Sequence, residues 1–204
     1  MTVAVIGIAG GTCAGKSWLA GAVAEALRPL EVALLRQDDY LWPLPPETRE
    51  HPLRHDFDRP EATDWERLEV DLAALRAGRE AAVPRFDPRT HARVRKARVV
   101  PPAPVVIVEG LLVLAIPAVR NLIDLKIFVD TPADLRLLRR AHRDMAQRGR
   151  TWPEVAEQYL RFVRPAHEQW VEPSRRWADL VVSGLPDGEP AAGLVVSRLV
   201  VLLH

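Results

Sequence analysis

The sequence has little of the residues and patterns that mark extracellular, membrane-spanning or nucleic-acid-binding proteins. Among 204 residues there is one cysteine, Cys13, so no internal disulfide framework can form, as is usual in a reducing compartment. No apolar run approaches the roughly 20 residues that a membrane-spanning helix needs. The 28 basic and 27 acidic residues give a net charge of +1, which provides no general attraction to nucleic acids or membrane surfaces. We therefore expect a cytoplasmic protein whose partner is a small molecule.

Lysine is also scarce, and one of the three lysines lies in a phosphate-binding motif. Lys16 belongs to residues 10–17, GGTCAGKS, which fit the pattern G-x-x-x-x-G-K-[ST]. The apolar, β-branched residues 3–8 precede the motif and predict a buried strand, and residues 17–27 show the apolar spacing of a helix. A strand, a glycine-rich turn and a helix in this order are the context of a nucleotide phosphate loop.

Each part of this loop has a predicted task in nucleotide binding. Glycines let successive backbone N–H groups converge on phosphates, next to the positive end of the following helix. Lys16 is expected to bridge the β- and γ-phosphates, and Ser17 to offer its hydroxyl to Mg²⁺. The motif thus predicts ATP or GTP as phosphate donor and Mg²⁺ as cofactor. The predicted cradle consists of Gly10, Gly11, Thr12, Cys13, Ala14, Gly15, Lys16 and Ser17.

Three more apolar segments predict an α/β fold. Residues 32–35, 105–108 and 127–129 read as short buried strands, and each is followed by polar residues. Open parallel sheets bind their ligands at the carboxyl ends of the strands. With helical segments between the strands, we expect a doubly wound, mainly parallel sheet of the P-loop kinase type, in a single domain over residues 1–204.

Two regions are expected to add to this sheet. The long connection over residues 40–104 predicts a substrate-binding insertion with a helix between Asp64 and Gly78 and a hairpin or loop pair over residues 83–100. Residues 131–165 predict an arginine-rich helical lid of two helices, and residues 190–204 a final surface helix.

Helix signals set the limits of the lid helices. Thr131 is the expected cap of the first, followed by a first-turn proline, and Gly149 ends that helix. Thr151 and Glu154 form a capping pattern for the second, which is expected to continue toward Arg164.

Acidic side chains follow two of the predicted strands. Asp38 is a candidate to accept the proton of an acceptor hydroxyl or to approach the metal, and Asp39 competes with it for this role. Glu109 ends its strand like a Walker B acid and could hold Mg²⁺ directly or through water. Arginines of a lid, Arg143 among them, are suited to stabilise the charge of a moving phosphoryl group.

The motifs GIAGGTCAGKS, QDDY, FDRPEA and VEGLLVL, followed by residues 127–179, resemble those of uridine-cytidine kinases. These are P-loop nucleoside kinases related to phosphoribulokinase. The resemblance implies transfer of the ATP γ-phosphate to the 5'-hydroxyl of uridine or cytidine, giving UMP or CMP in pyrimidine salvage. It also implies a homotetramer.

By the same resemblance, residues of this chain match functional positions of the family. Asp38 matches the catalytic aspartate. The positions that match nucleoside contacts are Asp58, Phe86, His91, Arg140, Arg150 and Gln158, those that match lid residues near the phosphates are Arg143 and Arg148, and Asp187 falls near the adenine end of the site.

The chain departs from the family pattern at two places, which leaves other functions open. Phe86 and Pro88 stand where the family usually has tyrosine and another aromatic residue, and residues 183–185 read SGL instead of PRG. A sibling kinase acting on nicotinamide riboside or phosphoribulose is the alternative, and a non-catalytic nucleotide-binding module is a further one. A guanine-nucleotide switch is excluded, because N-K-x-D is absent and the only asparagine is Asn121.

Overall fold

A five-stranded parallel sheet forms the centre of the protein in the computed structural model, which describes residues 3–49, 52–184 and 189–203. The strand order is β2-β7-β1-β8-β9, and every neighbouring pair is parallel. This confirms the doubly wound α/β fold predicted from the sequence. The strands are β1 (Ala4–Gly10), β2 (Val32–Arg36), β7 (Val105–Glu109), β8 (Leu125–Asp130) and β9 (Leu180–Ser183).

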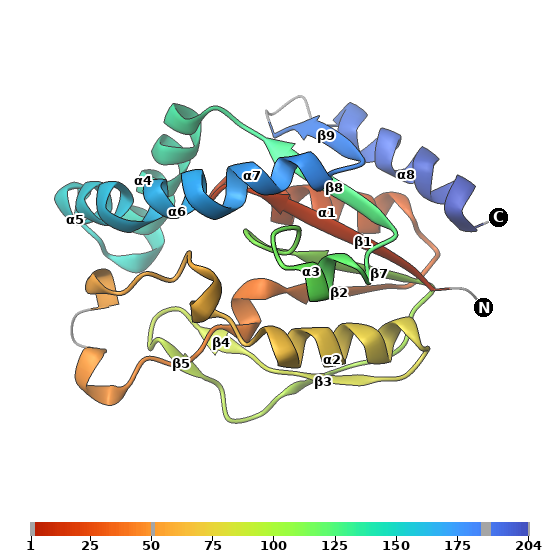
Figure 1. Ribbon diagram of the computed structural model, residues 1–204, viewed down its shortest axis with the longest axis horizontal. Coiled ribbons are helices and arrows are strands. Elements are labelled where there is room, and N and C mark those ends of the chain that lie inside the picture. The colour runs from red at the N-terminus through yellow and green to blue at the C-terminus, as the bar shows by residue number, and fades with distance from the viewer. Residues whose placement is uncertain (1–2, 50–51, 185–188, 204) are drawn as a thin grey trace.

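Helices cover both faces of the sheet (Figure 1). The helices α1 (Lys16–Ala26) and α8 (Glu189–Leu203) pack together on one face, whereas α2 (Trp65–Arg76) and α3 (Pro117–Arg120) lie against the other. Figure 1 also shows that β4 and β5 of the insertion and the lid helices α4 and α5 lie toward the same end of the sheet, the end at which the strands finish.

Alternation along β1 divides the core into two layers. Ile6 and Ile8 belong to the cluster that includes α1 and α8, whereas Val5 and Ala9 belong to the cluster on the α2 side. All four side chains are fully buried. A strand covered on both faces needs apolar residues at every position, which explains the continuous apolar run in the sequence.

In its described residues, the connection between β2 and β7 contains one α-helix and two small antiparallel sheets. Asp64 caps α2, since its Oδ1 accepts a hydrogen bond from the Arg67 backbone N–H at 3.2 Å, as the sequence predicts. The strands β3 (Ala81–Val83) and β6 (Arg98–Val100) pair, as do β4 (Phe86–Asp87) and β5 (Ala92–Arg93). Four 3-10 turns also lie between β2 and α2: Gln37–Tyr40, Pro46–Thr48, Pro52–Arg54 and Pro60–Ala62.

The lid region begins with α4 (Ala133–Arg148), which ends at Gly149 in the left-handed conformation with φ 65°. The capping box of Thr151 and Glu154 starts α5 (Trp152–Gln158), as predicted. The second lid helix is expected from the sequence to end near Arg164, but the helical path continues to Trp177. The turns at Tyr159–Val163 and His167–Val171 along this path have π geometry. The later segments are α6 (Arg164–Ala166), α7 (Glu172–Ser174) and a 3-10 turn, Arg175–Trp177.

Two local predictions are wrong. Thr131 does not cap α4; Pro132 occupies the cap position, and the Thr131 hydroxyl donates to the Ala14 carbonyl of the phosphate loop at 2.8 Å. The last helix is not merely a surface helix, since Val195 and Leu199 are fully buried against the sheet and α1. In both cases the partner is distant in sequence, so local patterns do not reveal it.

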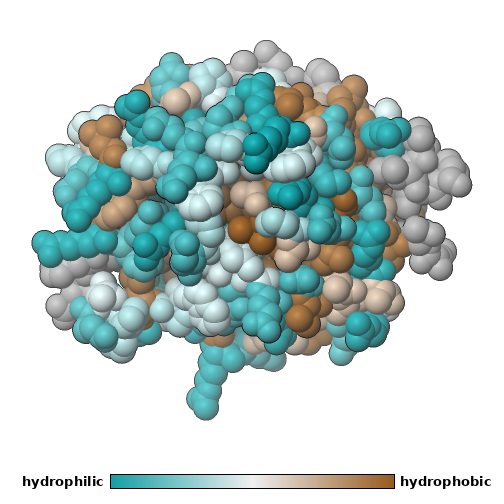
Figure 2. Space-filling view, viewed as in Figure 1, coloured by the Kyte–Doolittle hydropathy of each residue, from teal (hydrophilic) through white to brown (hydrophobic). Residues whose placement is uncertain are grey.

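Hydrophilic residues cover much of the face seen in Figure 2, with apolar areas between them. Such a mixture is ordinary for a protein surface. Among the helices that the structure describes, none has the length and apolar character to cross a membrane.

Candidate active site

The phosphate loop leaves β1 and enters α1 in a backbone conformation that requires glycine. Gly10 and Gly15 have φ angles of 145° and 107°, which side chains rarely allow, and Cys13 also has a positive φ of 55°. The Lys16 ammonium donates to the Gly11 carbonyl at 2.9 Å, so its side chain lies back across the loop. This curled loop, open at the helix N-terminus, fits a chain of phosphates.

Oxygen ligands suited to Mg²⁺ lie beside the loop. The Ser17 hydroxyl donates to Glu109 Oε1 at 2.8 Å, across from the Lys16 ammonium. Burial raises the pKa of Glu109 while Lys16 opposes that shift, and burial lowers the pKa of Lys16 while Glu109 and Asp38 oppose it. Among the described residues no cluster of three histidine, cysteine, aspartate or glutamate residues is close enough to hold a metal alone. The donor set therefore fits Mg²⁺ shared with phosphate oxygens and water.

The turn after β2 points Asp38 and Asp39, the two candidates for the catalytic aspartate, into different spaces. Asp38 lines a cavity next to the phosphate loop, whereas Asp39 lines a different recess. Buried Gln37 fixes this turn, because its Oε1 accepts from the Leu112 backbone N–H at 2.8 Å and its amide donates to the Thr63 hydroxyl at 3.2 Å. The geometry favours Asp38 for chemistry at the phosphates.

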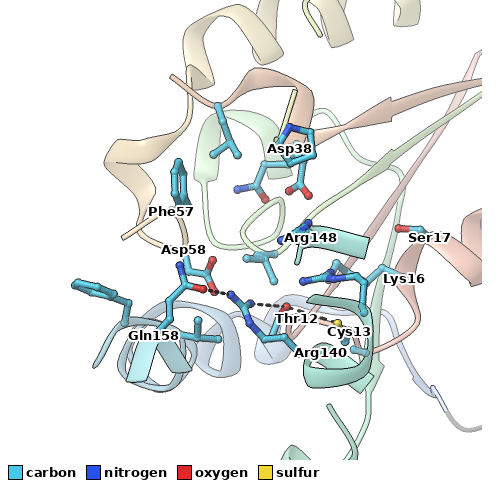
Figure 3. A pocket seen from close by; sticks show the side chains of 18 of the residues that line it. Thr12, Cys13, Lys16, Ser17, Asp38, Phe57, Asp58, Arg140, Arg148 and Gln158 are labelled. Carbon is cyan, nitrogen blue, oxygen red and sulfur yellow. Dashed lines mark hydrogen bonds between the residues drawn. The ribbon is translucent and has the colours of Figure 1, made fainter. Parts of the chain in front are cut away.

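One cavity of about 450 Å³ extends from the phosphate loop into the insertion and the lid (Figure 3). Figure 3 shows Lys16 and Ser17 on one side, Asp58 and Gln158 on the other, and Arg140 between Gln158 and Thr12. Such a cavity has the size of a small-molecule site.

Arg140 connects the two sides of this cavity. Its guanidinium donates to Thr12 Oγ1 at 3.0 Å and to Gln158 Oε1 at 2.8 Å. Gln158 Oε1 also accepts from Arg150 at 2.7 Å. Asp58 lies half-buried nearby, and burial raises its pKa to about 6, against the opposing effect of Arg140. The arrangement presents a carboxylate, an amide and guanidinium groups to a polar ligand.

Asp144, which the sequence analysis did not single out, organises the arginines of the lid. Its side chain is fully buried, and its carboxylate lies within 2.8 to 3.6 Å of four guanidinium groups. Burial alone would raise the pKa of this carboxyl, but the arginines hold it below the ordinary value. The four residues are Arg140, Arg143, Arg148 and Arg150.

Three aromatic rings of the insertion line one part of the cavity. Phe57 and His91 lie nearly parallel, with ring centroids 5.4 Å apart, and Phe86 lies 6.3 Å from Phe57 and 6.4 Å from His91. Burial, with Arg150 and Arg148, lowers the pKa of His91, so the ring is neutral at pH 7. Phe57 is a wall residue that the sequence analysis missed, although it directly precedes Asp58.

The structure brings most of the predicted site residues into this cavity. Gly10 and Gly11 shape the loop beneath it. Asp187 lies outside the described residues, so its place near the adenine remains a prediction. The predicted residues that line the cavity are Thr12, Cys13, Ala14, Gly15, Lys16, Ser17, Asp38, Asp58, Phe86, His91, Glu109, Arg140, Arg143, Arg148, Arg150 and Gln158.

Comparison with known protein sequences identifies the family of this chain. Residues 5–190 match the model of the Phosphoribulokinase / Uridine kinase family. A uridine kinase from Macrococcus caseolyticus is 42% identical over 200 residues, which are 98% of this chain and 97% of that protein. Uridine kinase-like protein 5 from Arabidopsis thaliana is 37% identical over 96% of this chain, which spans only 42% of that longer protein.

A solved structure of phosphoribulokinase from Rhodobacter spheroides shares the fold. The TM-score is 0.69 at 17% identity, over 89% of this chain and 70% of that one. The match to the family model and the identity to curated relatives agree with the parallel sheet, the phosphate loop and the cavity described above. The chain belongs to the phosphoribulokinase and uridine kinase family.

Proposed function

We propose that the protein transfers the γ-phosphoryl group of ATP or GTP to the 5'-hydroxyl of uridine or cytidine. The observation that carries the proposal is the single cavity that joins the phosphate loop to Asp58, Arg140, Gln158 and an aromatic wall. Membership of a P-loop kinase family implies a nucleotide phosphate donor. Relatives with 38 and 42% identity over nearly the whole chain bear the name uridine kinase, which supports this acceptor.

At the donor end, three side chains act on the phosphates and the metal. Lys16, kept inside the loop by its bond to the Gly11 carbonyl, neutralises charge on the phosphates as the transition state forms. Ser17 and Glu109 would hold Mg²⁺, with Asp38 near enough to take part directly or through water. When bound, Mg²⁺ supplies charge neutralisation for the phosphate oxygens.

Asp38 is the residue that would orient the acceptor. It lies in the cavity between the phosphate loop and the insertion, and its side chain is exposed to the cavity rather than engaged in a structural ion pair with a described residue. A carboxylate in that place can accept the proton of an attacking 5'-hydroxyl.

The insertion and the lid would hold the nucleoside. Asp58 accepts hydrogen bonds from the ribose hydroxyls in its ionised form, while Arg140 and Gln158 fix the neighbouring polar contacts. The Phe57 and His91 centroids are 5.4 Å apart, less than the about 7 Å that a third ring stacked between them would need. The base therefore packs against the outer faces and edges of these rings, with neutral His91 able to donate or accept.

Arg143 and Arg148 line the cavity from α4 and are oriented by Asp144. As the lid closes over both substrates, their guanidinium groups would stabilise the transferring phosphoryl group and exclude water. Since these arginines share one buried carboxylate, we expect them to act as a unit.

A coupled ADP-release assay over a panel of acceptors tests the proposal. With ATP and Mg²⁺, uridine or cytidine should give ADP and the 5'-monophosphate, and Asp38→Asn, purified in the same way, should do so about 10²- to 10³-fold more slowly. ADP release with nicotinamide riboside or ribulose 5-phosphate, and not with either pyrimidine nucleoside, would assign the chain to a sibling activity. Light scattering of the purified protein would test the homotetramer that the resemblance implies.

A further inference from the structure

A second recess lies on the other side of the hairpin that bears Phe86. It has a volume of about 500 Å³ and lies between β2, the edge strand of the main sheet, and the small hairpins of the insertion. Arginines dominate its charged lining. The charged residues are Arg36, Arg85, Arg89 and Arg98, with Asp39 and Asp87.

The four guanidinium groups outnumber the two carboxylates in this recess, so its lining has an excess of two positive charges, although the whole chain has a net charge of only +1. Arg98 donates to the Leu34 carbonyl at 3.0 Å, and Arg89 lies 3.7 Å from Asp87. Within the described part of the chain, Arg36 and Arg85 form no ion pair. Most of the donor groups of these arginines are therefore available to a ligand.

The excess of positive charge in this recess favours the binding of an anion. Guanidinium groups match phosphate oxygens through parallel N–H donors, which a single ammonium cannot do. We propose that this arginine recess binds a polyphosphate anion, either free or as the phosphate chain of a nucleotide. The recess is large enough for several phosphate groups.

The recess shares a wall with the nucleoside end of the active-site cavity. Phe86 and Pro88 line both spaces. Asp39 lines the recess and directly follows Asp38, and the turn that carries both aspartates packs against β4, which begins at Phe86. An anion in the recess would compete with Asp39 for Arg36 and Arg98 and so act on the hairpin that carries Phe86. This site is independent of the identity of the phosphate acceptor.

Isothermal titration calorimetry with inorganic tripolyphosphate tests the site, in about 0.15 M salt so that diffuse attraction is screened. The wild type should bind at two sites, the phosphate loop and the arginine recess. Lys16→Ala should weaken the first site and leave the second. In the Lys16→Ala background, Arg85→Ala and Arg36→Ala should each raise the remaining Kd by about tenfold, a loss of about 1.4 kcal/mol.

Arg79→Ala is the matched control, because Arg79 is an exposed arginine of the same insertion outside the recess. Arg79→Ala should leave both Kd values within about twofold of those of the parent protein. A larger effect of Arg85→Ala or Arg36→Ala is then specific to the recess. Loss of all binding in Lys16→Ala, or equal weakening by Arg79→Ala, would overturn the proposal. Arg85→Ala alone decides the question if Arg36→Ala lowers the melting temperature, since Arg85 is exposed and forms no ion pair with a described residue. Titration with nucleoside triphosphates in the same variants would show whether a base adds affinity.

Discussion

Arg140 donates a hydrogen bond to Thr12 Oγ1 at 3.0 Å and thereby joins α4 to the phosphate loop. The same guanidinium donates to Gln158 Oε1 at 2.8 Å, so α5 is also connected to the phosphate loop through Arg140. Because Arg140 is buried, these bonds are protected from competing water. The position of the lid helices is therefore linked directly to the phosphate loop.

Replacing Asp144 should destabilise the protein and the lid together. Asp144→Asn removes the one buried carboxylate that four arginines share, and breaking a buried ion pair typically costs about 3 to 5 kcal/mol. Urea unfolding should show a loss of at least about 3 kcal/mol. Asp134→Asn, an exposed acid in the first turn of the same helix, should cost about 1 kcal/mol or less.

The ion pairs of Asp144 also predict how the stability of the protein changes with pH. Since the arginines lower the pKa of Asp144, its contribution is present above the unfolded value of about 3.9 and is lost as pH falls through the folded pKa. The stability difference between wild type and Asp144→Asn should therefore shrink below pH about 4. A difference that stays constant down to pH about 2 would contradict this account.

Lys16→Ala and Asp38→Asn should each lower kcat by about 10²- to 10³-fold, because each removes a charge that acts in the transition state. Asp39→Asn is the matched control, because it makes the same chemical change at the neighbouring residue. Since Asp39 faces the other recess, its replacement should leave kcat within about threefold, well below the effect of a group in the transition state. A collapse of activity in Asp39→Asn with a near-normal Asp38→Asn would reverse the assignment.

Arg143→Ala should lower kcat by about 10²-fold or more while changing nucleoside KM much less, because phosphoryl charge develops most in the transition state. Arg161→Ala, an exposed arginine of the neighbouring helical segment, serves as control. Circular dichroism and thermal melting come first, since Arg143 also donates to Asp144 at 2.8 Å. Equal losses in kcat and nucleoside binding, with a lowered melting temperature, would indicate a folding defect instead.

The sequence predicts well those parts of the site that depend on short segments. The loop conformation follows from Gly10 and Gly15, and the strand positions follow from apolar runs that the sheet buries on both faces. Asp38 lies three residues after the run 32–35 and Glu109 directly follows the run 105–108, so their meeting in one cavity is a consequence of parallel strands.

Residues whose role depends on distant packing could not be predicted in this way. Asp144 lies among arginines on a helix that reads as a solvated surface, and the packing of α4 against α5 buries it. Phe57 lies in a segment without helix or strand periodicity, and its stacking on His91 depends on the β4 and β5 hairpin. Thr131 stands at the position of a helix cap in the sequence, but its hydroxyl donates a hydrogen bond to the Ala14 carbonyl of the phosphate loop instead.

The raised pKa of Asp58, about 6, predicts a pH dependence of nucleoside use. The ionised carboxylate would accept hydrogen bonds from the ribose hydroxyls. Since kcat/KM reports pKa values of the free enzyme, it should fall as the pH drops through about 6, the pKa of Asp58. Asp58→Asn should lower kcat/KM at pH 8 and remove the fall of kcat/KM on the acidic side of the pH profile. An unchanged fall in Asp58→Asn would assign the titration to another group.

The raised pKa of Asp58 also predicts an effect on stability. Because a carboxylate that is costly to bury destabilises the native state above its unfolded pKa, the same variant should melt at a higher temperature near neutral pH.

Phe86→Tyr tests the base end of the cavity. Phe86 lies 6.4 Å from His91 between ring centroids, so its ring lines the wall but offers no hydrogen bond to the histidine or the base. A tyrosine hydroxyl there would add one hydrogen bond, worth about 0.5 to 1.5 kcal/mol net. We expect wild type to use both uridine and cytidine, since neutral His91 can donate or accept, and Phe86→Tyr to lower KM for at least one of them by up to about tenfold. Initial rates of both enzymes with both nucleosides give the measurement. If Phe86→Tyr instead raises KM for both, the hydroxyl is excluded by a base that packs directly on the Phe86 ring, and the aromatic wall then selects by shape rather than by hydrogen bonding.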